Sequence, residues 1–185
     1  MEKANNPEEV QEVAQNDDLV DHYWNIINYI NSLIRASEIK AGLILSFYGI
    51  LLNFFFQYLD GFLEMAKTDM LVAVFMAVWF TLTISSIFFS FKCFMPLILA
   101  KYDKNIFFFG DVIGSFGSIK EYSNALLKTS QNKELLFGQL GEQVFINSQI
   151  ASTKFKYVNK SIRILAINIA LIFIFSIIYA IKAYI

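Results

Sequence analysis

The chain has little of what catalysis and disulfide-stabilised domains require. Its 185 residues include one cysteine, one histidine and two prolines. The single Cys93 excludes an internal disulfide framework. His22 is the only histidine, so no convincing Ser-His-Asp set, Cys-His set or metal site can be assembled, and no GxxxxGK phosphate loop occurs. We therefore expect no catalytic residue, no metal, no cofactor and no enzymatic activity.

Charge is also scarce, and apolar side chains take its place. Only 17% of the residues are charged, whereas 56% are hydrophobic and 17% aromatic, which is too apolar for a soluble domain. The formal net charge of -1 gives no reason to expect a nucleic acid partner. Residues 1–21 hold seven acids and one lysine, unlike an export signal. We predict a membrane protein whose first segment stays in the cytoplasm.

Three apolar windows are long enough to cross a bilayer. A hydrocarbon core of about 30 Å needs roughly 20 helical residues. The windows 41–59, 70–91 and 164–181 meet this length without a charged side chain, and the last crossing is expected to reach residue 182. Residues 94–100 extend the second window, but Pro96 favours an interfacial continuation over a fourth crossing. The sequence thus predicts three transmembrane helices.

The distribution of Lys and Arg predicts the orientation. Thirteen of these residues lie before residue 41 or within 92–163, and two lie elsewhere. We therefore expect a multi-pass protein of the cell inner membrane with a cytoplasmic N-terminus. The expected segments are a disordered acidic N-terminus at 1–16, a cytoplasmic amphipathic helix at 17–40, a short external loop at 60–69, and a cytoplasmic helical region at 92–163 with a Gly/Phe-rich elbow at 105–118.

Two segments predict long helices that continue into the membrane. No proline or glycine occurs between Asp17 and Gly42, and the apolar residues there recur on one helix face. After Lys133 no proline occurs, and apolar residues keep a near-heptad spacing around Asn147. The predicted fold is all-α: an integral membrane protein with three transmembrane helices, two of which continue as long cytoplasmic helices that pack into a bundle.

A line of small and polar residues runs along the first crossing. Small residues and amides let membrane helices approach and bond to one another, so this line predicts a side that faces protein. In an assembly it could instead line a wet path. Packing is the commoner role for such residues, and both readings stay open. The members of this seam are Gly42, Ser46, Gly49, Asn53 and Gln57.

Charged residues flank the crossings on the predicted cytoplasmic side. Arg35 and Glu38 are three residues apart and can pair on a helix, while Lys40 can snorkel to the interface. The alternative role for all three is coupling of a ligand to the membrane helices. The elbow likewise fits either core filling at a turn or part of a ligand pocket.

Lysines crowd the approach to the third crossing. Such clusters usually anchor topology, and contact with an anion or nucleotide is the alternative. The residues that we expect to contact an anion or a base are Lys154, Lys156 and Tyr157.

Three stretches resemble the transmembrane effectors of Pycsar antiphage systems. The segment Arg35-Ala-Ser-Glu38-Ile-Lys40-Ala-Gly42 resembles the family motif R-x-x-D-x-K-A, with Glu38 where Asp is usual. Phe108-Phe109-Gly110-Asp111 resembles its FFG element, and residues 143–157 resemble its stretch with Lys-x-x-Tyr before the last crossing. The resemblance covers roughly residues 21–181.

The resemblance implies an antiphage defence effector. A partner nucleotide cyclase would make cyclic CMP or cyclic UMP, and the effector would assemble as a homo-oligomer and disrupt the inner membrane, causing abortive infection. The rival functions are a constitutive small channel or transporter subunit, which would conduct without a second messenger, and a membrane scaffold, which would tolerate Asn53→Leu.

Overall fold

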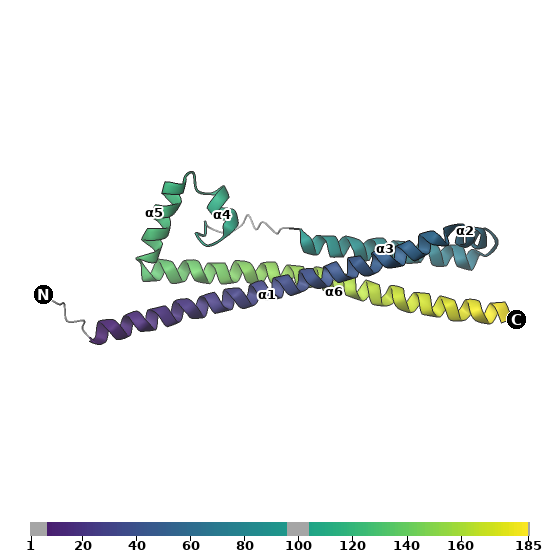
Figure 1. Ribbon diagram of the computed structural model, residues 1–185, viewed down its shortest axis with the longest axis horizontal. Helices are drawn as coiled ribbons and strands as arrows, with labels where there is room; N and C mark the ends of the chain where they lie inside the picture. Colours follow the sequence, from purple (N-terminus) through teal and green to yellow (C-terminus); the bar gives the residue numbers. More distant parts are fainter. Residues whose placement is uncertain (1–6, 96–103, 185) are drawn as a thin grey trace. The chain divides into compact units, whose positions relative to one another are not determined.

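The described residues are helical throughout, apart from turns. A computed structural model describes residues 7–95 and 104–184, and within them no strand occurs (Figure 1). This confirms the all-α prediction. The helices are α1 (Pro7–Gln57), α2 (Leu59–Thr68), α3 (Met70–Phe94), α4 (Phe109–Gly114), α5 (Ile119–Ser130) and α6 (Lys133–Tyr184).

The helices begin and end where local chemistry favours it. Pro7 is the first residue of α1, a position where the missing N–H of proline is not needed. Asp69 caps α3, because its carboxylate accepts a hydrogen bond from the backbone N–H of Leu71 at 3.1 Å. At the other end of α3, Met95 has extended backbone angles, as a residue before a proline prefers.

The chain forms two compact units. Unit 1 comprises Met1–Leu33 and Pro96–Ala151, and unit 2 comprises Ile34–Met95 and Ser152–Ile185. In the described residues, unit 1 contains the first part of α1, α4, α5 and the first part of α6. Unit 2 contains α2, α3 and the remaining parts of α1 and α6.

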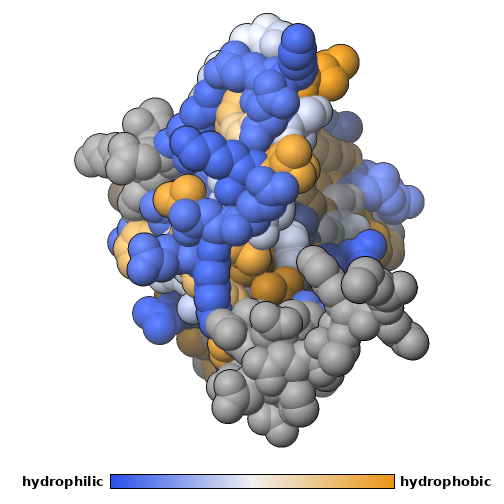
Figure 2. All heavy atoms as spheres, turned by 90° about the vertical axis from the view of Figure 1, so that its left-hand side faces the viewer, coloured by the Kyte–Doolittle hydropathy of each residue, from blue (hydrophilic) through white to orange (hydrophobic). Residues whose placement is uncertain are grey.

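Unit 1 has an apolar core and a polar surface. Its buried side chains come from α1, from the residues around α4 and from α6, and Figure 2 shows that the face on the side of α5 and the start of α6 is largely hydrophilic. This surface suits water rather than lipid. The apolar core side chains are Ile27, Ile30, Ile106, Phe108, Leu140, Ile146 and Ala151.

Unit 2 has the reverse arrangement. Large apolar side chains point outward along α1, α3 and α6. Inside, hydroxyl and amide groups lie beside an apolar cluster of Ala41, Ile44, Tyr48, Cys93 and Val158. Three described helices, α1, α3 and α6, contain stretches long and apolar enough to cross a membrane. An apolar exterior around an interior that includes polar groups is the arrangement expected in lipid, where water does not drive apolar groups inward. The structure thus agrees with three transmembrane helices.

The helix boundaries differ from those expected in two places. α1 starts at Pro7 rather than near residue 17, although it continues past Lys40 without a break as expected. The segment 60–69, expected as a loop, is mostly helix α2, because Tyr58 interrupts α1 for one residue and the chain then resumes helical bonding, with the N–H of Phe62 donating to the Tyr58 carbonyl. Residues 1–6 and 96–103, which carry part of the expected disordered and interfacial segments, lie outside the described residues.

Candidate functional site: a buried lysine and a polar ladder

Lys154 joins three helices of unit 2 through one ammonium group. Its side chain is 4% exposed, and Nζ donates to the Glu38 carboxylate on α1 at 2.8 Å and to the Cys93 carbonyl on α3 at 2.5 Å. The Cys93 carbonyl belongs to the last turn of α3, whose carbonyls have no partner within the helix. A cation at this position also complements the negative end of the helix dipole. Lys154 therefore caps α3 and ties it to α1 and α6.

A cluster of buried serines lies one heptad further along α6 in the same unit. The hydroxyl of Ser161 on α6 donates to the carbonyl of Ser86 on α3 at 2.8 Å, and the hydroxyl of Ser86 reaches the Ser161 carbonyl at 3.0 Å. The Ser90 hydroxyl lies 2.8 Å from that of Ser161. All three residues are fully buried. Small side chains at this crossing let the two backbones come close enough for hydroxyl-to-carbonyl bonds in both directions.

Asn168 forms a third polar cluster. Its Nδ2 donates to the Thr83 hydroxyl on α3 at 2.9 Å and to the Tyr48 hydroxyl on α1 at 3.2 Å, and each of the three side chains is nearly or fully buried. The Asn168 Oδ1 has no hydrogen-bond partner among the described residues. The cluster is thus only partly satisfied, which is unfavourable in a low-dielectric interior.

The three clusters fall on one line of α6. Lys154, Ser161 and Asn168 are spaced by seven residues, the interval at which a helix packed in a bundle returns to the same face. We call these residues and their partners the polar ladder. The same interval runs back to Asn147, which is buried in unit 1 and donates to the Asn31 side chain at 3.3 Å. The apolar heptad of this segment was predicted from the sequence and this polar one was not, although the seven-residue spacing of the four residues is readable there.

The expected ligand-contacting residues do not gather into one cationic site. Glu38 bonds to Lys154 rather than to Arg35, so the Arg35–Glu38 pair that the spacing allowed does not form, and Arg35 is exposed. Lys156 is also exposed. Lys154, expected to meet an anion, is buried and already paired. The structure contains no ligand, so contact of these residues with a nucleotide stays a prediction.

A set of lysines lies over aromatic rings around the Lys154 end of unit 2. Lys40 Nζ lies 5.6 Å from the centre of the Phe155 ring, and Lys160 Nζ lies 5.2 Å from that of Phe89. Lys92 Nζ lies 5.6 Å from the ring of Tyr157, which stacks on Phe89. Such contacts hold the cations at a fixed level of the helices while their heads remain reachable by anions.

The seam of small and polar residues on α1 lies largely outside the packing within this chain. Ser46, Gly49, Asn53 and Gln57 are exposed, and only Gly42 is half-buried, near the Phe94 ring. The buried stripe of α1 is the neighbouring one, with Ser37, Ala41, Ile44 and Tyr48. Whether the seam meets another copy stays a prediction.

The elbow of unit 1 is organised by Asn105, a residue that the sequence analysis did not single out. Asn105 is fully buried, and its Nδ2 donates to the Gln139 carbonyl on α6 at 2.8 Å. Its Oδ1 accepts from the N–H of Phe107, and its own N–H donates to the Asp111 carboxylate at 2.9 Å. Phe108 fills the core whereas Phe109 is 73% exposed, so the core-filling role expected for the elbow applies to part of it.

The polar groups described above are suited to holding helices together and to forming hydrogen bonds with a ligand. Among the described residues no group of three or more His, Cys, Asp or Glu side chains could hold a metal ion. Buried hydroxyls, an amide and an ion pair inside a membrane unit specify which helix faces meet, and polar groups within membrane helices often mark paths for ions or water. The Lys154 pair and the polar ladder are therefore the candidate functional site.

Comparisons with known proteins point to one family. The family model described as the Pycsar effector protein domain matches residues 22–181. The chain is similar to the Pycsar effector protein PtPycTM of Propioniciclava tarda, with 23% identity over 159 residues that cover 82% of this chain and 75% of that protein. No solved structure gives a significant match.

Proposed function

Because this chain belongs to the family of Pycsar effector proteins, we propose that it is an antiphage defence effector that responds to a cyclic nucleotide by disrupting the cell inner membrane. The family match over residues 22–181 is the observation that carries this function. The ligand, cyclic CMP or cyclic UMP, and the resulting abortive infection come from the resemblance. A nucleotide cyclase is the functional partner.

The proposed switch is the Lys154 pair. A cyclic nucleotide carries one negative phosphate, which can replace a carboxylate as the partner of an ammonium group. Arg35 and Lys156 are exposed cations of the same unit and are available to the phosphate. A phosphate that draws Lys154 from Glu38 would also remove the cap from the Cys93 carbonyl. The end of α3 would then be free to move against α1 and α6.

Repacking of the polar ladder follows from that release. A ligand shifts an equilibrium between two packings only if it binds one of them more tightly. The ladder can have two packings because its bonds are individually weak, about 0.6–1.7 kcal/mol each in membrane proteins, and because Asn168 Oδ1 lacks a partner. We propose that the second packing assembles copies of the chain and breaches the bilayer.

The exposed seam of α1 is the proposed contact between copies. Asn53 and Gln57 are exposed amides on an otherwise apolar stretch of α1, and an amide facing hydrocarbon without a partner is unfavourable. Ser46 satisfies its hydroxyl within its own helix, through the Gly42 carbonyl at 3.0 Å. Amides that bond across a homo-oligomer interface would satisfy Asn53 and Gln57 in the same way. The proposed N-terminus is cytoplasmic, where the ligand is made.

Dye leakage from liposomes tests this function. The purified chain is reconstituted in vesicles loaded with a self-quenching dye, and cyclic CMP, cyclic UMP, cyclic AMP and cyclic GMP are added in turn. Linear 5′-CMP and 5′-UMP are the matched controls. We expect leakage with one or two cyclic nucleotides only. Leakage without any nucleotide would favour a constitutive channel, and no leakage under any condition would contradict the proposal.

A further inference from the structure

A second site lies at the α2 end of unit 2, away from the Lys154 pair. It consists of two cavities that share Tyr179 as a lining residue. One is small, about 250 Å³, and is lined by Asp69, Lys182 and Thr68 among others. The other has about 620 Å³, well within the range of about 300–1,000 Å³ for ligand sites. A small cavity with two charged side chains beside a large apolar one fits an amphiphile.

The larger cavity is walled by aromatic rings from four helices. Phe55 stacks on Phe62 with ring centres 5.2 Å apart and on Trp79 at 5.3 Å, so the walls are held by their own contacts. Broad, rigid apolar walls accept a flexible hydrocarbon chain without specific polar contacts. The aromatic residues that carry the argument are Phe55, Tyr58, Phe62, Trp79, Phe175 and Tyr179.

Trp79 gives this cavity one unsatisfied polar group. Its side chain is 3% exposed, and its Nε1–H has no hydrogen-bond acceptor among the described residues. A buried donor without an acceptor costs free energy, and tryptophan normally finds one. The Nε1 atom has almost no accessible surface, so an acceptor such as the ester of a glycerolipid would reach it only if the surrounding side chains moved.

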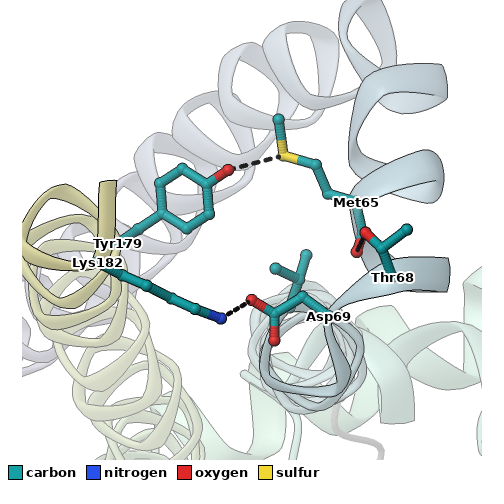
Figure 3. Close-up of a pocket in the computed structure, with 6 residues that line it drawn as sticks. Met65, Thr68, Asp69, Tyr179 and Lys182 are labelled. Carbon is teal, nitrogen blue, oxygen red and sulfur yellow. Dashed lines mark hydrogen bonds and ion pairs between the residues drawn. The ribbon is translucent and has the colours of Figure 1, made fainter. Parts of the chain in front are cut away.

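The smaller cavity carries both signs of charge. Lys182 Nζ donates to the Asp69 carboxylate, and the Tyr179 hydroxyl donates to Met65 Sδ at 3.6 Å, as Figure 3 shows. The Asp69 and Lys182 side chains are 24% and 59% exposed, so a solute can reach both. A headgroup with one phosphate and one primary ammonium matches this pair, phosphate to lysine and ammonium to aspartate.

We propose that these two cavities bind one zwitterionic phospholipid, with its phosphate and primary ammonium at Lys182 and Asp69 and one acyl chain in the aromatic cavity. The occupant is a membrane lipid with an ethanolamine headgroup. Phosphatidylglycerol lacks the cation that Asp69 requires. Phosphatidylcholine has a quaternary ammonium that cannot donate a hydrogen bond. We therefore expect the site to bind the ethanolamine lipid more tightly than the other two lipids.

Tryptophan fluorescence in nanodiscs tests the lipid site. The chain has two tryptophans, so Trp24→Phe leaves Trp79 as the single reporter inside the proposed site. Phospholipids with brominated acyl chains quench a tryptophan that they touch, and they are added at rising mole fraction with each of the three headgroups. We expect the ethanolamine lipid to reach half-quenching at a mole fraction roughly two- to fivefold lower than the other two, since exposed ion pairs contribute modestly.

Headgroup variants separate a built site from lipid that merely surrounds the helices. Asp69→Asn keeps a capping side chain for α3, and with Lys182→Gln it should abolish the preference for ethanolamine while quenching persists. Lys67→Gln, an exposed lysine on α2, is the matched control and should preserve the preference. Equal quenching by the three lipids in the Trp24→Phe protein, or a preference that survives both headgroup variants, would overturn the proposal.

Discussion

Lys154 holds its place by bonding to a charge and a helix end at once. Lys154 is only 4% exposed, so its ammonium group needs hydrogen-bond acceptors and a counter-charge nearby. It finds them in the Cys93 carbonyl and the Glu38 carboxylate. The contribution of such a lysine to folding stability is seen mainly when it is removed, because its partners are then left unpaired. The unpaired carboxylate and the uncapped carbonyl remain when the lysine is removed.

Replacing Lys154 by methionine should therefore destabilise unit 2. The change keeps most of the side-chain volume and removes both hydrogen bonds. We expect the free energy of unfolding, measured by SDS titration in detergent micelles, to fall by about 1–3 kcal/mol, because Glu38 is partly exposed and can regain water. Lys156→Met on the exposed side of the same helix is the matched control and should change it by less than about 0.5 kcal/mol.

A double-mutant cycle isolates the ion pair from the cap. Glu38→Gln in the Lys154→Met background should add little to the loss already caused by Lys154→Met. Fully additive losses would mean that the two side chains act independently and that the 2.8 Å contact has no energetic weight.

Ser161 offers a second test at a single residue. Ser161→Ala removes the bonds of the Ser161 hydroxyl to Ser86 and Ser90 without enlarging the side chain, while the bond from the Ser86 hydroxyl to the Ser161 carbonyl remains. We expect a loss of about 0.6–1.7 kcal/mol in the same SDS titration. Ser176→Ala on the same helix removes only a bond to the Ile172 carbonyl at an exposed position. Equal effects of the two substitutions would show that the serine cluster does not hold α3 to α6.

At the level of elements, α5 has a cap that depends on pH. The Ser118 hydroxyl accepts from the N–H of Glu121, and the Glu121 carboxylate accepts from the N–H of Gly117 at 2.9 Å, a reciprocal arrangement close to a capping box. The hydrogen bond from Gly117, followed by that from Lys104, lowers the pKa of Glu121 below its ordinary value. A lowered pKa in the folded protein means stability that is present above the ordinary pKa.

The start of α5 should lose protection in acid. As the pH falls below about 4.5 and then through the lowered pKa, Glu121 is protonated and its contribution to the cap disappears. Hydrogen exchange of the amides of residues 117–122, corrected for the pH dependence of the intrinsic rates, should show faster opening in this window. In the Glu121→Gln variant, opening should not become faster over this pH window. If the variant opened faster in acid just as the unmodified protein does, the effect would belong to another group.

The elbow depends on one asparagine. Asn105→Ala removes the side-chain bonds to the Gln139 carbonyl on α6 and to the Phe107 N–H, while the bond from its backbone N–H to Asp111 remains. We expect the opening of this segment, seen by hydrogen exchange, to increase by about ten- to a hundredfold. Asn124→Ala, at an exposed position of α5, is the control and should leave the exchange unchanged. No difference between the two variants would mean that the aromatic contacts alone hold the elbow.

Much of the helix layout could be predicted from sequence, because lipid imposes a simple rule of length and apolarity on 41–59, 70–91 and 164–182. The continuity of α6 followed from the absence of proline after Lys133, and that of the first part of α1 from the absence of proline and glycine between Asp17 and Gly42. The seven-residue spacing of the ladder on α6 is readable in the sequence, but its partners are not, since a helix with apolar residues all round does not show which stripe of the neighbouring helix is buried. On α1 the buried stripe with Ser37 and Tyr48 lies one residue away from the seam that polarity suggested.

At the scale of the whole molecule, the seam should govern assembly. Asn53→Leu removes one of the two exposed amides of the α1 seam and leaves Gln57, so contacts between copies should lose part of their hydrogen bonding. We expect chemical cross-linking in membranes to give fewer oligomers and leakage to fall in proportion. Phe54→Leu, an exposed apolar neighbour, is the control. Unchanged cross-linking in the Asn53 variant would remove the seam from the assembly contact and favour a scaffold role.

The central claim is that the helices of unit 2 must repack for the bilayer to be breached. The Ser86 and Ser161 hydroxyls are 2.9 Å apart, so cysteines at these positions, with Cys93→Ser to remove the native thiol, are close enough for a disulfide that locks α3 to α6. The measurement is nucleotide-induced dye leakage from liposomes that carry this variant, oxidised and then reduced. We predict that the oxidised protein does not leak and that reduction restores leakage, whereas equal leakage in both states would contradict the account.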